Sequence, residues 1–395
     1  MIDIQVTLMC KNISVAELTG TLDKSGLPIF TASSVHITNP SLVPISIIQD
    51  EKVVDRFNIW FKKRYFSDKR HFPVEKIEWF HPGQPHFCSL SDQYWIKYDV
   101  SERWEKVNFF TNSYSETFGD ISFSYNMDEI KNITISFESP DLTTNGILDK
   151  RWKRITKKGQ EIDILIKRSS KYYKQDILSE IMASRYLEKM QLIPFVKYSL
   201  FIDGYAFSCM CPNFVDEDTA FVPAWEIVSA IPKEKDVPIY THLIRCVEQF
   251  KIPNALEFID NMIIVDRMML NFDRHLGNFG FLRNSNTGEF IGPAPIFDFG
   301  DAFFSKDENI EQVSKLFFDR EKELLNLKKI PLLDFSVIES DIAETFFLLP
   351  EEKTKLLSDI QKNNRYILSF QKNHKQKEKK ANEKEADIQI ANVFF

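Results

Sequence analysis

The chain has 395 residues, of which 43% are hydrophobic and 27% are charged, and its formal net charge is −7. This length suits two domains or lobes better than one small core. The negative charge gives no electrostatic reason to expect direct binding of nucleic acid or of an anionic membrane. The N-terminus "MIDIQVTLMC" lacks the features of a signal peptide, and no stretch of about 18 apolar residues occurs. Five scattered cysteines favour reduced thiols, so we expect a cytoplasmic protein.

Residues 1–135 are predicted to form an N-terminal α+β domain. Short strands separated by turns are indicated by "DIQVTLMC", "ISVAELTG" and "DKSGLPIF". A helix is predicted over Glu51–Arg64, where apolar residues recur at helical spacing. These residues are Val53, Phe57, Trp60 and Phe61. A loop and an aromatic segment, "HPGQPHFCSLSDQYWIKY", follow.

The same loop brings His81, His86 and Cys88 within eight residues of one another. These side chains are metal ligands in many proteins, but a zinc site needs a fourth ligand. The spacing matches neither the C-x2-C nor the H-x3-H pattern. The favoured interpretation is therefore a loop without a metal.

Residues 136–215 combine strands with one helix. "EIDILIKRSS" alternates as a strand does, and "DILSEIMASRYLEKM" has the period of a helix and contains neither Gly nor Pro. "FVKYSLFI" and "YAFSCMC" are predicted strands joined by a turn at Asp203 and Gly204. This segment should form a small β-rich lobe.

Residues 216–370 are predicted to be mainly helical. "ALEFIDNMIIVDRMMLNF" is the longest apolar-periodic run, and "EEKTKLLSDIQKNNRYILSFQKN" continues the helical pattern. The tail, residues 371–395, is rich in Lys, Glu and Asn. The favoured interpretation of the tail is a solvated helix end, and the alternative is a basic docking site.

The stretch "NFDRHLGNFGF", Asn271 to Phe281, has the residues of a phosphotransfer site. Asp273 is the candidate proton acceptor for a substrate hydroxyl. Asn278 follows five positions later, which matches the D-x-x-x-x-N spacing of a kinase catalytic loop. One Asn and one Asp suffice to bind Mg²⁺, because this cation keeps several waters. His275 is expected to be a structural hydrogen-bonding residue and not a base.

"PIFDFGDAFF" follows twenty residues after Asn278 and contains a literal DFG beginning at Asp298. Two short strands and a hairpin are predicted between the two motifs. Such a hairpin would bring Asp298 back beside Asn278. Both side chains offer the hard oxygen ligands that Mg²⁺ prefers.

A cation and its partner are predicted upstream. Lys167 ends the alternating strand, on the face opposite Ile164 and Ile166. Glu180 lies on the apolar side of the following helix. A carboxylate on a buried face requires a cation, and Lys167 is the candidate.

The loop before this strand contains no G-x-G-x-x-G pattern. Backbone N–H groups around Thr143, Thr144 and Gly146 are the candidates to hold a phosphate. Small, soft residues around Met210 and Cys211 suit the wall of an adenine pocket, and the backbone that follows would contact the base.

Together these motifs resemble the HipA-like Ser/Thr kinases of bacterial toxin–antitoxin systems, over about residues 139–370. "SPDLTTNGILDKRW" and "LSDQYWIKY" also resemble uncharacterised HipA-domain proteins. The resemblance implies that Asp273 is the catalytic residue and that Asn278 and Asp298 are Mg²⁺ ligands. Lys167 would then bind phosphate.

The resemblance implies a bilobal protein-kinase-like fold of the α+β class, with an extra N-terminal α+β domain. Residues 136–215 would be the N-lobe with its phosphate loop, and residues 216–370 the helical C-lobe. ATP and Mg²⁺ are the implied cofactors, a protein Ser or Thr hydroxyl the acceptor, and an antitoxin a partner. A small-molecule kinase and an ATP-binding regulatory module without turnover remain as alternatives.

Two interpretations remain open for Thr143 and Thr144. Family members phosphorylate their own phosphate loop, and by that resemblance this pair would accept a phosphate that repels ATP. Alternatively, both hydroxyls cap the turn through side-chain hydrogen bonds.

Overall fold

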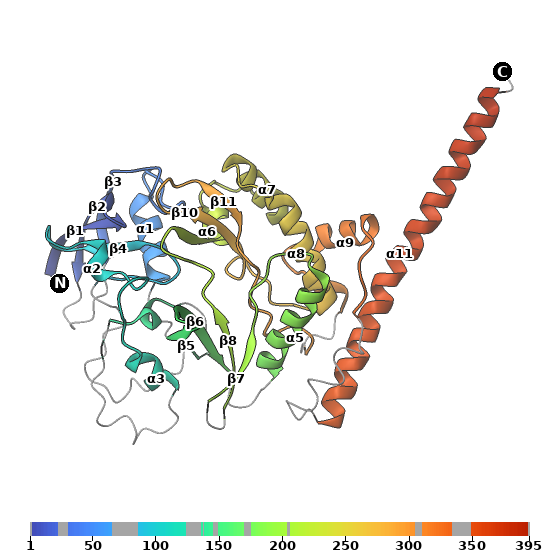
Figure 1. The fold of residues 1–395 in the computed structure, drawn as a ribbon. Helices are drawn as coiled ribbons and strands as arrows, with labels where there is room; N and C mark the ends of the chain where they lie inside the picture. The colour runs from blue at the N-terminus through green and yellow to red at the C-terminus, as the bar shows by residue number, and fades with distance from the viewer. Residues whose placement is uncertain are drawn as a thin grey trace. The chain divides into compact units, whose positions relative to one another are not determined.

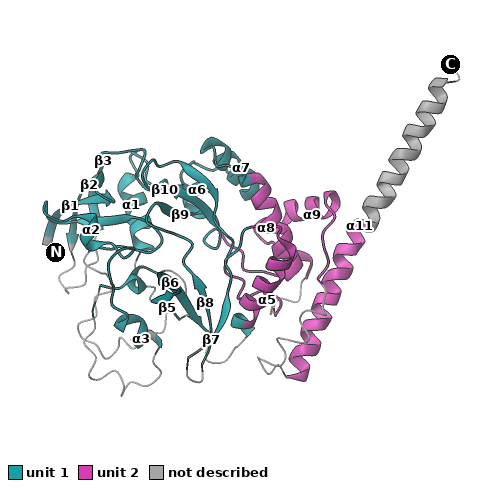
Figure 2. Cartoon of the chain, viewed as in Figure 1, with its two compact units in different colours: residues 1–177, 194–255, 276–297 teal, residues 178–193, 256–275, 298–395 magenta. Residues whose placement is uncertain are grey.

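A computed structural model describes residues 2–22, 31–64, 86–123, 136, 138–144, 149–169, 175–203, 206–304, 310–333 and 349–393. The chain divides into two compact units, shown in Figure 2. Unit 1 comprises Met1–Ile177, Pro194–Ala255 and Leu276–Phe297. Unit 2 comprises Leu178–Ile193, Leu256–His275 and Asp298–Phe395. The four-part division expected from the sequence stays a prediction.

The first sheet of unit 1 is antiparallel, with the strand order β3-β2-β1-β4 (Figure 1). The strands are β1 (Ile2–Cys10), β2 (Ile13–Leu22), β3 (Thr31–Ile37) and β4 (Tyr94–Lys97). β1 and β2 confirm two predicted strands. The third, "DKSGLPIF", lies outside the described residues, and β3 begins directly after it.

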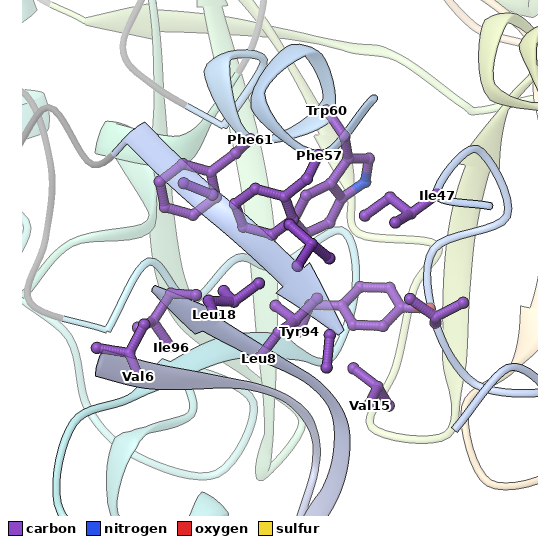
Figure 3. Packing of buried hydrophobic residues seen from close by; sticks show 14 of the residues in the cluster. Val6, Leu8, Val15, Leu18, Ile47, Phe57, Trp60, Phe61, Tyr94 and Ile96 are labelled. Atoms are coloured by element: carbon purple, nitrogen blue, oxygen red, sulfur yellow. The ribbon is translucent and has the colours of Figure 1, made fainter. Parts of the chain in front are cut away.

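Helix α1 (Val53–Lys62) packs against this sheet. Its buried side chains are the four predicted from helical spacing, Val53, Phe57, Trp60 and Phe61. Figure 3 shows three of them facing strand residues such as Leu8 and Ile96. The Trp60 and Tyr94 rings meet edge to face with centroids 5.6 Å apart. Aromatic burial of this kind is the main stabilising contribution of such a core.

The second sheet of unit 1 is antiparallel, in the order β5-β6-β8-β7. Its strands are β5 (Lys150–Lys157), β6 (Gln160–Arg168), β7 (Ser199–Asp203) and β8 (Ala206–Pro212). Ile164 and Ile166 are buried on one face together with Phe123. The predicted hairpin is confirmed, since Asp203 pairs with Ala206 across the β7–β8 turn. Short helical segments precede this sheet, and they are α2 (Trp104–Val107), α3 (Thr117–Phe123) and η2 (Pro140–Thr143).

The third sheet has the order β11-β10-β9 and is also antiparallel. Its strands are β9 (Thr219–Pro223), β10 (Gly280–Asn284) and β11 (Phe290–Pro293), and the helices beside them are α6 (Ala224–Ser229) and α7 (Ile239–Gln249). The β10–β11 hairpin confirms the strands predicted between the two motifs. β9 was not predicted, because five residues give too little alternation to separate a strand from the helix that follows.

Residues on both sides of position 135 share one apolar core in unit 1. Trp152 packs in a cluster whose other buried members come from earlier in the chain. These are Met9, Cys88, Leu90, Trp95, Trp104 and Phe109. The N-terminal sheet and the second sheet are therefore joined by side-chain packing.

In unit 2 the described elements are helices. They are α5 (Gln175–Met190, of which the first three residues belong to unit 1), α8 (Ala255–Met269, of which the first residue belongs to unit 1), η3 (Ile310–Gln312), α9 (Phe318–Leu327) and α11 (Pro350–Val393). α5, α8 and α11 confirm predicted helices, and α11 extends through most of the charged tail. Asn363 of α11 donates to the carbonyls of Arg267 and Met268. Among the described residues no helix combines the length and apolarity needed to cross a membrane.

Candidate active site

The turn after α8 carries Asp273. Leu270 ends the helix with a φ of 55°, the left-handed conformation common at helix C-termini. Asp273 is an exposed residue whose carboxylate is nevertheless partly shielded by its neighbours. This desolvation raises its pKa, Asp301 and Asp298 raise it further, and His275 and Arg274 act in the opposite direction. A raised pKa brings a carboxylate closer to the range in which general bases operate.

Arg274, the next residue, is buried. Its guanidinium donates to both carboxylate oxygens of Asp266 on α8, with Nε–Oδ2 at 2.9 Å. Asn271 donates to the same carboxylate at 2.8 Å. Burial alone would lower the pKa of Arg274, but the carboxylates of Asp266, Asp298 and Glu180 together outweigh it and the net shift is upward. This buried pair holds the turn that presents Asp273.

Asp298 begins a strained segment. Its φ of 65° is unusual for a residue other than glycine, although Asp tolerates it better than most. The Phe299 N–H donates to Oε2 of Glu180 at 2.9 Å, and the Ser179 hydroxyl donates to the Ala302 carbonyl at 2.6 Å. α5 therefore fixes the backbone on both sides of Gly300. Backbone strain held in this way is frequent at functional sites.

Within unit 2, Glu180, Asp273 and Asp298 thus belong to one region. The electrostatic influence of Asp298 and Asp301 on Asp273 requires that the carboxylates lie near one another. Such mutual repulsion is what a divalent cation relieves, and carboxylate oxygens are ligands that Mg²⁺ prefers. The Mg²⁺ site expected at these residues stays a prediction. Among the described residues, no group of three or more His, Cys, Asp or Glu side chains could hold a metal ion.

Lys167 lies near the end of β6 in unit 1 and is buried, with 4% exposure. Its Nζ lies 4.9 Å from the centroid of the Tyr198 ring. In the register of the sheet Lys167 is opposite Cys209, and Met210 is opposite Ile166. Lys167 and Glu180 belong to different units, so the pair expected between them stays a prediction.

Met210 and Cys211 lie in β8, an interior strand of the sheet. Pairing with β7 ends at Met210, whereas pairing with β6 continues through Cys211. Asn213 then donates its backbone N–H to the Asp163 carbonyl. The role of this segment as an adenine-binding backbone stays a prediction.

Asn278 belongs to unit 1 and is buried, with 7% exposure. The backbone on both sides of it is fixed by the start of α6. The Trp225 N–H donates to the Leu276 carbonyl at 2.9 Å, and the Ala224 N–H donates to the Phe279 carbonyl at 3.0 Å. The carboxamide is therefore presented from a rigid turn.

The two threonines of the loop before β5 serve the turn itself. Thr143 is buried, and its hydroxyl donates to the carbonyls of Cys88 and Pro140. The Thr144 hydroxyl donates to the Pro140 carbonyl at 2.8 Å and accepts from the indole N–H of Trp152. This geometry favours the turn-capping interpretation over a phosphate contact. Gly146 lies outside the described residues.

The loop with His81, His86 and Cys88 is predicted to hold no metal. His81 lies outside the described residues, so only His86 and Cys88 can be placed. The His86 ring is 3.2 Å from the Ile96 carbonyl and 3.7 Å from the Glu102 carboxylate. Cys88 is fully buried, and burial raises its pKa. Both side chains are therefore used in packing and hydrogen bonding.

Asp266 and Arg274 were not identified from the sequence. A signal was present, because Asp266 stands inside the apolar run "MIIVDRMML" and a charge on a buried helix face requires a partner. Helical periodicity does not name that partner, which comes from the turn eight residues later. The pairing is visible only in the folded chain.

No known protein-family profile matches the chain. A curated relative, the serine/threonine-protein kinase CtkA of Helicobacter pylori, is 35% identical over 101 residues, which is 22% of this chain. The chain spans 31% of the length of that relative.

A comparison with solved structures gives two matches, both with TM-scores below 0.5. The crystal structure of the H. pylori proinflammatory kinase CtkA has a TM-score of 0.44 at 20% identity and covers 57% of this chain and 90% of its own. HipA of the Shewanella oneidensis MR-1 toxin–antitoxin system, in complex with HipB and operator DNA, has a TM-score of 0.43 at 11% identity. The match covers 92% of this chain and 91% of that chain. The 35% identity to a serine/threonine-protein kinase over 101 residues agrees with the resemblance to HipA-like kinases that the motifs predict.

Proposed function

We propose that this chain is an ATP-dependent phosphotransferase that passes the γ-phosphoryl group of ATP to a Ser or Thr hydroxyl of a protein. The fold would be the bilobal one of protein kinases. The observation that carries the proposal is the arrangement in unit 2 of Asp273 and Asp298. Two buried contacts hold them, Arg274 with Asp266 and Phe299 with Glu180. The 35% identity to a curated Ser/Thr kinase supports the reaction class.

Each residue has a defined task in this proposal. Asp273 accepts a hydrogen bond from the substrate hydroxyl and orients it, and its raised pKa suits proton acceptance. Lys167 contacts the ATP phosphates. Asn278 and Asp298 would hold Mg²⁺, which when bound neutralises charge on the transferred phosphoryl group. Positioning and charge stabilisation account for most catalysis of this kind.

The test is transfer from labelled ATP to proteins of a cell lysate, compared between the wild type and Asp273→Ala. Asp273 orients the acceptor and does not bind the nucleotide, so the variant should lose about 10²–10⁴-fold of transfer. Its ATP affinity should stay near that of the wild type. Asp319→Ala, an exposed carboxylate on α9, is the matched control.

The outcomes separate the proposal from its alternatives. Transfer by Asp273→Ala within about tenfold of wild type contradicts the role of Asp273. Binding of ATP with no transfer to any acceptor indicates a regulatory module. Transfer to small hydroxyl compounds with none to protein indicates a small-molecule kinase.

A further inference from the structure

Arg283 lies in β10, five residues after Asn278, and is buried with 5% exposure. Every nitrogen of its guanidinium has an acceptor. Nε donates to the Gly288 carbonyl at 2.7 Å, Nη1 to the Val43 carbonyl at 2.8 Å and to the Tyr94 hydroxyl at 3.3 Å, and Nη2 to the Ser41 carbonyl. Most of these acceptors belong to the N-terminal part of the chain.

The β10–β11 turn approaches residue 41 very closely. Gly288 has a φ of +77°, and a Cβ atom placed there would lie 2.0 Å from the Ser41 carbonyl oxygen. Only glycine satisfies both conditions. The Tyr94 hydroxyl completes the junction by donating to the Leu42 carbonyl at 2.7 Å. The turn, β10 and residues 41–43 are therefore held at a fixed separation.

The neighbouring strand β9 is held from the same side. Gln93 donates its carboxamide N–H groups to the Asp216 and Thr219 carbonyls, at 2.8 and 2.6 Å. The Phe221 N–H donates to the Ser91 carbonyl at 2.8 Å. Because β9 pairs with β10 along its length, these bonds also restrain β10.

Asn278 stands between this junction and the start of α6. On either side of Asn278, the Leu276 and Phe279 carbonyls accept from Trp225 and Ala224, and Trp225 packs on the core of the N-terminal sheet. Downstream, Arg283 connects β10 to residues 41–43. Both ends of the segment therefore depend on the N-terminal part of the chain.

We propose that Arg283 is a positioning residue that sets the placement of the Asn278 carboxamide, with residues 41–43 and Tyr94 as its frame. The proposal rests on the proposed function, in which Asn278 is a Mg²⁺ ligand. It assigns to the N-terminal part of the chain a direct role in metal-dependent transfer. A displacement of about 1 Å at such a site typically lowers the rate about 10²-fold.

The test compares Arg283→Ala, the milder Tyr94→Phe and the control Lys11→Ala. Lys11 also links the N-terminal part to this region, but through two exposed partners, Asp218, whose side chain is 66% exposed, and Asn286 of the β10–β11 turn. Turnover is measured at a temperature well below the unfolding midpoint and is divided by the folded fraction of each variant. We expect Arg283→Ala to lose about 10- to 100-fold of turnover, with a several-fold higher half-saturating Mg²⁺ concentration. Tyr94→Phe should move both values in the same direction by about threefold, and Lys11→Ala should move neither.

ATP affinity in EDTA should be unchanged in all variants, because Asn278 acts through the metal. Hydrogen exchange of the amides of residues 276–284 gives a readout that needs no activity, and it should accelerate in Arg283→Ala but not in Lys11→Ala. Normal turnover and Mg²⁺ dependence in the folded fraction of Arg283→Ala overturn the proposal. A wild type without phosphoryl transfer overturns the proposed function instead. The positioning claim then depends on hydrogen exchange alone and is overturned if exchange is unchanged.

Discussion

At the residue scale, the ion pair between Arg274 and Asp266 connects the turn that carries Asp273 to α8. The two side chains are 2% and 1% exposed. Removing one member of such a pair leaves a buried charge without compensation, which typically costs about 3–5 kcal/mol. We therefore expect Arg274→Leu to lower the free energy of unfolding by about this amount, measured by urea denaturation. Arg245→Ala, which breaks the exposed pair with Glu234, should change it by less than about 1 kcal/mol.

A double-mutant cycle with Asp266→Asn distinguishes the pair from simple loss of packing. If the ion pair is responsible, Asp266→Asn should recover part of the stability lost in Arg274→Leu, since no charge is then left buried. A double variant whose loss of stability equals the sum of the two single losses would contradict this account.

Asp298 and Lys167 are expected to affect ATP binding in different ways. Asp298→Asn removes a negative charge at the proposed metal site, so ATP affinity should fall about tenfold in Mg²⁺ and stay unchanged in EDTA. Lys167→Ala removes a phosphate contact and should weaken binding under both conditions. Calorimetry in the two buffers makes the comparison. Normal Mg²⁺-dependent binding by Asp298→Asn would mean that this carboxylate does not hold the metal.

At the element scale, local periodicity accounts for what the sequence predicts well. α1, α5 and α8 and strands β1, β2 and β6 have regular apolar spacing, and all are present. The burial of Glu180 follows from its helical period, whereas the strand period places Lys167 opposite the apolar face and does not predict that it is buried. Predictions are poorer where a contact joins distant parts of the chain. Arg283 resembles any strand arginine until residues 41–43 fold against it.

The short helix α6 contains a buried carboxylic acid, Glu226. Burial raises its pKa from 4.5 to about 8, and Asp92 adds to the shift. The Ser46 hydroxyl, Arg283 and Arg64 act in the opposite direction. Lys63 also interacts with Glu226 electrostatically. Between pH 4.5 and about 8 the unfolded chain has lost this proton while the folded protein keeps it, so the free energy of unfolding falls as the pH rises.

Glu226→Gln should remove this dependence. The carboxamide cannot ionise, and it can still accept the hydrogen bond from Ser46. Urea denaturation at pH 5 and pH 8 should show that the wild type loses more stability than the variant, by an amount on the order of 2–4 kcal/mol. Glu248→Gln, an exposed carboxylate on α7, should keep the slope of the wild type. Parallel pH profiles of wild type and Glu226→Gln would exclude a proton on Glu226.

At the scale of the whole molecule, residues before and after the boundary expected near residue 135 contact one another within unit 1. The composition change at that point predicts preferential cleavage there by a protease. Side chains from before and after it share the core around Trp152, and Arg283 and Gln93 add polar bonds across it. A cut in the chain removes none of these contacts. The sequence predicts the place of the boundary, whereas only the folded chain shows how strongly the two sides are joined.

We therefore expect the two fragments produced by cleavage near residue 135 to remain bound to each other. Their contacts are largely apolar and enclosed, as in permanent complexes, and separation would expose the Trp152 core and the buried guanidinium of Arg283. Size-exclusion chromatography in native buffer should give a single peak that contains both fragments, and the same digest in urea should resolve two. Tyr94→Phe, which removes two hydrogen bonds of the junction, should lower the urea concentration at which the fragments separate. Fragments that elute apart in native buffer would show instead that residues 1–135 fold as an independent domain.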